Sequence, residues 1–115
     1  MLEKPKFLQG TYPFQGKGLT TPVAMQPAVT YKVPTDKRST LTYFRAGNSS
    51  AEMIYFLVKR DGAPMRYFPV GAKSAIHIAL AVTEDLNPDT SLEVLVAAPE
   101  GTSGQVVIDL GIVEF

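Results

Sequence analysis

The sequence contains no cysteine and no tryptophan, and it has a single histidine, His77. Without cysteine the chain cannot form disulfide bonds, thiolate metal sites or iron–sulfur clusters, and it has no thiol nucleophile. A single imidazole also excludes metal centres that are built from several histidines. We therefore expect this chain to hold no metal ion and no other cofactor.

Long apolar segments are missing as well. No run approaches the roughly 20 apolar residues that a helix needs to cross a bilayer. The charged start, Met1–Lys6, does not lead into the continuous apolar stretch of a secretory leader. The sequence therefore predicts a cytoplasmic protein without membrane contact, and its 115 residues correspond to one domain.

The balanced charge of the chain conceals an uneven distribution. Residues 1–82 hold all 11 lysines and arginines with four carboxylates, which gives +7. Residues 83–115 hold seven carboxylates and neither lysine nor arginine, which gives −7. A neutral domain has no general attraction for nucleic acid or anionic membranes. We expect the two halves to neutralise each other, either within one molecule or between copies.

Proline and glycine are concentrated near the N-terminus, where the first 27 residues contain four of the nine prolines. Proline stops helices and cannot donate a hydrogen bond to a strand ladder. The same segment carries Phe7, Tyr12 and Phe14, which a solvated tail would not need. We therefore predict an extended docking arm over residues 1–27, and a β-sandwich domain over residues 28–115. The arm would dock on its own sheet or on a neighbouring subunit.

From residue 28 onward, apolar residues recur with a period of two, which is the pattern of β-strands. Residues 83–90 could hold one helical turn at most. The strands are expected at residues 28–33, 39–46, 52–60, 65–70, 74–82, 91–98 and 105–115. The predicted fold is all-β: an antiparallel β-sandwich of about seven strands, immunoglobulin-like or jelly-roll-like. A small closed barrel is the alternative.

Catalysis is not expected from this residue set. His77 is the one candidate base for acyl transfer, and it lies in mid-strand without a Gly-x-Ser-x-Gly elbow elsewhere in the chain. The carboxylates lie mostly at strand ends and in turns, where solvation explains them. We therefore predict that the chain is not an enzyme, and a small hydrolase stays as a second alternative.

Two short motifs suggest ligands or modification, but turns explain them better. Residues 84–89 gather oxygen ligands that could suit Ca²⁺, yet they lack the ligand spacing of an EF-hand. Asn48-Ser49-Ser50 fits the N-glycosylation pattern, and the preceding glycine favours a turn. Neither motif predicts a functional site.

Basic and aromatic residues interleave between positions 31 and 68. The basic residues are Lys32, Lys37, Arg38, Arg45, Lys59, Arg60 and Arg66, and the aromatic ones are Tyr31, Tyr43, Phe44, Tyr55, Phe56, Tyr67 and Phe68. Such a mixture is typical of single-strand nucleic-acid binders, but aromatic residues inside apolar strands usually pack in the core. Nucleic acid is therefore not the expected partner. A module that binds carbohydrate or single-stranded nucleic acid on a β-surface is the alternative function.

The most informative feature is that several predicted strands are apolar on both faces, where a solvated sheet would alternate with polar residues. The arm, a partner protein or another copy of the chain could cover the second face. We predict a non-catalytic binding or assembly protein, a self-associating adaptor or structural subunit. The candidate interface residues are Phe7, Tyr12, Phe14, Ala75, His77, Ala79, Ala81, Leu95, Val107, Val113 and Phe115.

His77 itself has two interpretations. The first is a neutral, half-buried histidine with a backbone partner. The second places His77 in a flat, alanine-rich interface, where protonation below about pH 6.5 would loosen the contact between subunits.

Overall fold

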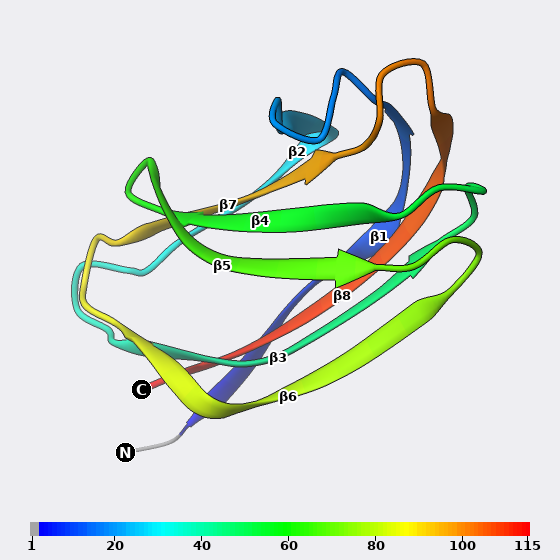
Figure 1. Ribbon diagram of the computed structural model, residues 1–115. Helices are drawn as coiled ribbons and strands as arrows, with labels where there is room; N and C mark the ends of the chain where they lie inside the picture. The colour runs from blue at the N-terminus through cyan, green and yellow to red at the C-terminus, as the bar shows by residue number, and fades with distance from the viewer. Residues whose placement is uncertain (1–2) are drawn as a thin grey trace.

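The structure is a computed structural model that describes residues 3–115, with the backbone alone for residue 82 (Figure 1). Its eight strands are β1 Lys4–Gln15, β2 Val23–Lys32, β3 Ser39–Asn48, β4 Ile54–Arg60, β5 Ala63–Val70, β6 Ala75–Leu86, β7 Ser91–Ala97 and β8 Ser103–Glu114. The all-β prediction is confirmed. Over the described residues, no helix has the length and apolarity needed to span a membrane.

The strands form two four-stranded antiparallel sheets, ordered β1-β8-β3-β6 and β2-β7-β4-β5. The two sheets face each other across one core (Figure 1). Only β4 and β5 are consecutive strands of the same sheet, so every other connection crosses from one sheet to the other. This crossing pattern is that of an eight-stranded jelly roll, one of the two predicted sandwich types.

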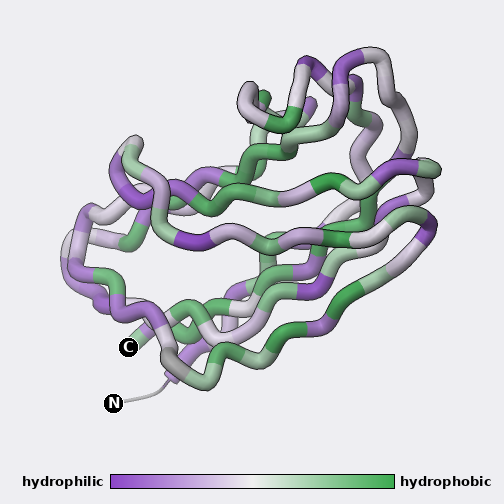
Figure 2. The backbone as a smooth tube through the Cα atoms, in the orientation of Figure 1, coloured by the Kyte–Doolittle hydropathy of each residue, from purple (hydrophilic) through white to green (hydrophobic). Residues whose placement is uncertain are grey.

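The inner faces of both sheets meet in an apolar core that is rich in aromatic contacts. The ring of Phe44 stacks on Phe68 with centroids 4.3 Å apart and lies 5.4 Å from Phe56. Hydrophobic segments run along the strands and hydrophilic ones along several turns (Figure 2). Core packing is therefore the fate of these three phenylalanines, as expected for aromatic residues inside apolar strands.

The N-terminal segment predicted as an arm contributes strands to both sheets. β1 pairs with β8 along its whole length, from Lys4 opposite Glu114 to Gln15 opposite Ser103. Its prolines are tolerated because β1 is an edge strand and one side of its ladder is free. The predicted boundary at residue 27 falls inside β2, whose ladder with β7 shifts register between Ala24 and Val29. β1 is thus the eighth strand, which the sequence pattern did not predict because of its prolines.

The acidic segment at residues 84–89 is neither a helical turn nor a cluster of free ligands. β6 continues to Leu86, and each carboxylate is engaged by a separate partner. Thr40 donates to Asp85 at 3.1 Å and Thr35 donates to Asp89 at 2.8 Å. No group of three metal-ligating side chains occurs within the described part of the chain.

The ion pairs join the basic and the acidic halves of the chain within one molecule. Arg45 lies 3.7 Å from Asp109, and Glu84 pairs with both Arg60 and Arg66. Arg60 and Arg66 come from β4 and β5, so the Glu84 pairs connect the two sheets. Such partly exposed pairs contribute little stability each, but they account for part of the cancelled charge.

Asn48 closes the turn after β3 and uses its whole amide group. Its Nδ2 donates to the carbonyl oxygens of Glu52 at 2.9 Å and Gly71 at 3.0 Å. Its Oδ1 accepts hydrogen bonds from the backbone N–H and the hydroxyl of Ser50. Asn48 is 5% exposed. It is the last residue of β3, and the predicted turn begins only after it, so Asn48 is not an accessible glycosylation site.

Replacing Asn48 by aspartate should destabilise the fold. The Asn48→Asp carboxylate has the same shape, but it would turn acceptor oxygens toward the carbonyls of Glu52 and Gly71. We expect the free energy of unfolding to fall by about 2–4 kcal/mol in urea titrations. Asn87→Asp, at an exposed turn, is the matched control and should change it by less than about 0.5 kcal/mol. Equal effects of the two variants would contradict this account of Asn48.

A second buried polar contact lies where the two sheets meet at the C-terminal end of β8. The hydroxyl of Tyr31 donates to Oε2 of Glu114 at 2.6 Å and lies 2.8 Å from the hydroxyl of Ser39. Burial and the hydrogen bond to Glu114 raise the pKa of Tyr31 to about 12. Tyr31 lies on β2, and its hydroxyl thus provides a hydrogen bond to a carboxylate of the opposite sheet.

The raised pKa of Tyr31 predicts a loss of stability at alkaline pH. Between pH 10 and 12 the folded protein keeps a proton that the unfolded chain releases, so stability falls as the pH rises through this range. The free energy of unfolding of the wild type should therefore decrease more steeply than that of Tyr31→Phe. Tyr43 also has a raised pKa, but it is present in both proteins. Parallel pH profiles would refute the assignment.

Candidate functional site

The candidate site lies on the solvent-facing surface of sheet β1-β8-β3-β6, which we call the outer face. Strand register aligns its side chains in rows across all four strands. One row runs Gln9, Asp109, Arg45, His77; the next runs Phe7, Gly111, Tyr43, Ala79; a third runs Thr11, Val107, Gly47, Ala75. The alternate residues of these strands, such as Ile108 and Leu110, point into the core.

Several predicted interface residues meet on this outer face. They are Phe7, Ala75, His77, Ala79, Val107 and Val113. Phe7 is 53% exposed and Val107 is 54% exposed, so part of the outer face is both apolar and uncovered. Ala81 is exposed on β6, beyond the regular part of the β3–β6 ladder.

The remaining candidates do not lie on the outer face. For most of them the reason is that side chains alternate between the two faces of a strand. Tyr12 and Phe14 are on the inner side of β1 and pack with the core, so they are not free for an interface. Leu95 lies on the outside of the other sheet and is 8% exposed. Phe115 follows the end of β8 and is 37% exposed.

His77 is exposed and is not half-buried. The reason is its strand: β6 is an edge strand, and the neighbours of His77 along β6 on the outer face, Ala75 and Ala79, are too small to cover an imidazole. The ring of Tyr43 stands edge-on to His77, with centroids 5.9 Å apart and an interplanar angle of 82°. In the described part of the chain, no hydroxyl or carboxylate is hydrogen-bonded to His77, so the arrangement that a hydrolase needs is not formed there.

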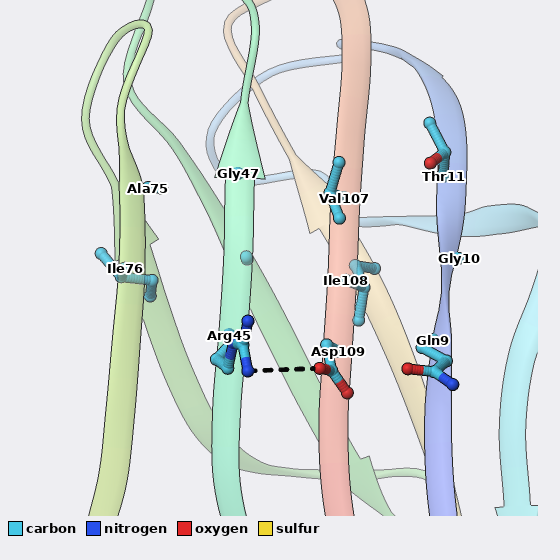
Figure 3. Close-up of a pocket in the computed structure, with 11 residues that line it drawn as sticks. Gln9, Gly10, Thr11, Arg45, Gly47, Ala75, Ile76, Val107, Ile108 and Asp109 are labelled. Carbon is cyan, nitrogen blue, oxygen red and sulfur yellow. Dashed lines mark ion pairs between the residues drawn. The ribbon is translucent and has the colours of Figure 1, made fainter.

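Beside these residues the outer face is hollowed. The hollow has a volume of about 600 Å³ and spans β1, β8, β3 and β6 (Figure 3). Gly47 has no side chain and Ala75 has only a methyl group, so neither residue fills the space above the sheet at the bottom of the hollow. Longer side chains surround it, and those of Gln9, Arg45 and Asp109 bring hydrogen-bonding groups to its rim.

One polar group of the rim, the carboxylate of Asp109, is held in place by Tyr43. Its ring lies over Gly111, in the space that any larger residue would fill. Its hydroxyl donates to Oδ1 of Asp109 at 3.0 Å, and Arg45 Nη1 lies 3.7 Å from Oδ2 of the same carboxylate. Burial and the hydrogen bond to Asp109 raise the pKa of Tyr43. The outer face thus presents a donor, Arg45, beside an acceptor, Asp109, that the Tyr43 hydroxyl holds in place.

Sequence reasoning did not select Asp109 or Gly111, and it treated Tyr43 and Arg45 only as members of a basic and aromatic stretch. One signal could have found them. A glycine inside a strand often marks the close approach of another group, and here that group is the ring of Tyr43.

Comparisons with known proteins agree with the sandwich fold. The chain is similar to a family 35 carbohydrate binding module from Clostridium thermocellum, with a TM-score of 0.54 and 12% identity over 95% of this chain and 97% of that chain. Weaker matches are a structure of the infectious bursal disease virus Gx strain (TM-score 0.45, 11% identity, 98% of this chain and 36% of that chain) and the exo-beta-1,3-galactanase from Phanerochaete chrysosporium (TM-score 0.40, 12% identity, 94% and 29%). No family model matches the sequence, and no curated protein is similar to it. At these identities the likeness shows the fold alone.

The contact between Tyr43 and Gly111 predicts a site-specific effect of a single methyl group. Gly111→Ala should displace the Tyr43 ring and break its hydrogen bond to Asp109. We expect a loss of about 1–3 kcal/mol in the free energy of unfolding, and a lower pKa of Tyr43 in an ultraviolet titration. Gly47→Ala is the matched control, because its nearest neighbour would be Val107 Cβ at 3.9 Å. If both variants behave alike, the ring does not depend on Gly111.

Proposed function

We propose that this chain is a non-catalytic binding module that takes neutral carbohydrate on the outer face. The observation that carries the proposal is the Arg45–Asp109 pair at the rim of the hollow, where the Tyr43 hydroxyl holds the carboxylate of Asp109. The likeness in fold to a carbohydrate binding module is consistent with this role.

The charge of the rim favours a neutral ligand rich in hydroxyl groups. A hydroxyl both donates and accepts hydrogen bonds, so neighbouring hydroxyls of a sugar can accept from Arg45 and donate to Asp109. An anion would meet the carboxylate of Asp109, and a cation would meet the guanidinium of Arg45. Hydrogen bonds to charged partners are also the stronger ones, and they compensate the ligand for lost water.

Apolar surface next to the rim suits the remaining part of a sugar. Pyranose rings carry C–H groups on their faces, and these pack against the electron-rich face of an aromatic ring. Phe7 and Tyr43 flank Gly111 in one row of the outer face, and Phe7 is 53% exposed. The hollow of about 600 Å³ lies within the usual size range of small-ligand sites.

Single-stranded nucleic acid is less well supported by the same surface. Arg45, Arg60 and Arg66 each pair with a carboxylate, which lowers the positive potential that a phosphate backbone needs. Of the aromatic residues in the basic stretch, Phe44 and Phe56 are fully buried and cannot stack on a base.

Calorimetric titration with a panel of neutral oligosaccharides tests this function. At least one sugar should bind the wild type and remain uncleaved. Asp109→Asn should weaken that binding by tenfold or more, since a charged acceptor contributes about 1.5–3 kcal/mol. Tyr67→Ala, which removes an exposed tyrosine from the opposite sheet, is the control and should bind normally.

Two results would overturn the proposal. The first is that no sugar of the panel binds the wild type. The second is that Tyr67→Ala, rather than Asp109→Asn, loses binding, which would place the site on the other sheet.

The assembly role predicted from the sequence is a second candidate, favoured by the exposed Phe7 and Val107. Loss of self-association in Val107→Lys, without any sugar binding, would support that candidate.

A further inference from the structure

The four edge strands of the sandwich differ in how they are protected. The edges are β1 and β6 in one sheet, and β2 and β5 in the other. Natural proteins protect edge strands with proline, charge or bulges, because unpaired backbone groups can pair with another chain. Proline occurs in three of these strands: β1 holds Pro5 and Pro13, β2 holds Pro27, and β5 holds Pro64 and Pro69.

β6 is the edge strand without proline. From Ala75 to Thr83 it also lacks any lysine, arginine, aspartate or glutamate. Its ladder with β3 is regular over Ala75–Ala79 and shifts register only beyond that point. Ile78, within this regular part, is 41% exposed. Figure 1 shows β6 at the outer margin of its sheet. The free edge over Ala75–Ala79 therefore has a regular register and none of the protection that proline, bulges, lysine, arginine or carboxylates provide.

We propose that this edge pairs with the same segment of a second copy of the chain. The two strands would run antiparallel around a two-fold axis at His77. Such pairing sets Ala75 opposite Ala79, Ile76 opposite Ile78, and His77 opposite its own symmetry mate. Residues directly opposite each other share one face of an antiparallel pair. The exposed Ile78 would then contact Ile76 of the second copy.

The segment fits a second copy because it is self-complementary. Each pair around His77 joins residues of the same kind, alanine with alanine and isoleucine with isoleucine, and no lysine, arginine or carboxylate faces its like. A two-fold contact requires this, since one surface must match itself. The ladder is short, so the dimer is weak and depends on concentration.

Pairing at the edge leaves the outer face open. The two four-stranded sheets would join into one sheet of eight strands, with the two hollows on the same side. This inference does not rest on carbohydrate binding, because the contact is made by the backbone of β6 and by Ile78 packed on Ile76 of the second copy. Ile76 also lines the hollow, but Ile78 does not. The hollow is lined mainly by β1, β3 and β8.

Sedimentation velocity over a concentration series tests the dimer. The wild type should shift from monomer to dimer as concentration rises, and Ile78→Lys should stay monomeric. Lysine on the edge would place two positive charges near each other across the axis. Val107→Lys makes the same charge change on the central strand β8, where the residue is 54% exposed, and it should still dimerise. Circular dichroism checks that each variant is folded.

Hydrogen exchange gives a second measurement that does not need a variant. Amides between residues 75 and 79 should exchange at least tenfold more slowly in the concentrated protein than in the dilute one. If Ile78→Lys fails to fold, His77→Lys replaces it, because that side chain is exposed and would face its own copy. A wild type that stays monomeric at every concentration, or a dimer that protects β1 instead of β6, overturns the proposal. Ile78→Lys should keep its sugar binding, so the two proposals fail separately.

Discussion

The register of β8 between β1 and β3 is the constraint on which both the core and the outer face depend. Four even-numbered apolar residues of β8 are at most 1% exposed, namely Val106, Ile108, Leu110 and Ile112, and the odd-numbered residues between them lie on the outer face. A slip of one residue would exchange the two sets, and it would place the carboxylate of Asp109 in the core. Because burial of the even set fixes this register, it also fixes Asp109 opposite Arg45. The geometry of the site is thus a consequence of core packing.

Period-two patterning predicted the strands that have one strongly apolar face. It failed for β1, where prolines that protect the edge of the sheet interrupt the pattern. Pro5 and Pro13 indicate a segment that cannot join a ladder, yet β1 joins one along its whole length. The resolution is that only one side of β1 is paired. Whether a strand is at an edge is a property of the complete topology, which no local pattern contains. For the same reason the sequence pattern predicted a boundary at residue 27, although β2 runs through that position.

The sequence indicated the apolar residues of the candidate site but not its polar ones. An apolar residue on the second face of a predicted strand pointed to Val107, because a solvated sheet should be polar there. Phe7 was selected because it is apolar in a segment that was predicted as an arm. The polar partners gave no such signal. Tyr43 and Asp109 are 66 positions apart, and their hydrogen bond depends on β3 and β8 being neighbours. Gly111 could have been noticed as a glycine within a strand, but the group that approaches it becomes known only from the fold.

The charge asymmetry along the chain is related to both proposals. Arg45 and Asp109 come from opposite halves of the sequence, and their pairing in one molecule makes the rim of the hollow neutral as a whole while it keeps both a donor and an acceptor. Had the halves remained on separate surfaces, copies would attract each other through long-range charge, and salt would weaken that attraction. Because part of the charge is paired internally, we expect self-association to depend on short-range contacts. The unprotected edge of β6 offers such contacts, and a dimer formed there would present two hollows side by side. A ligand with repeated units could then bind both hollows, and the second binding event would gain from the effective concentration set by the first.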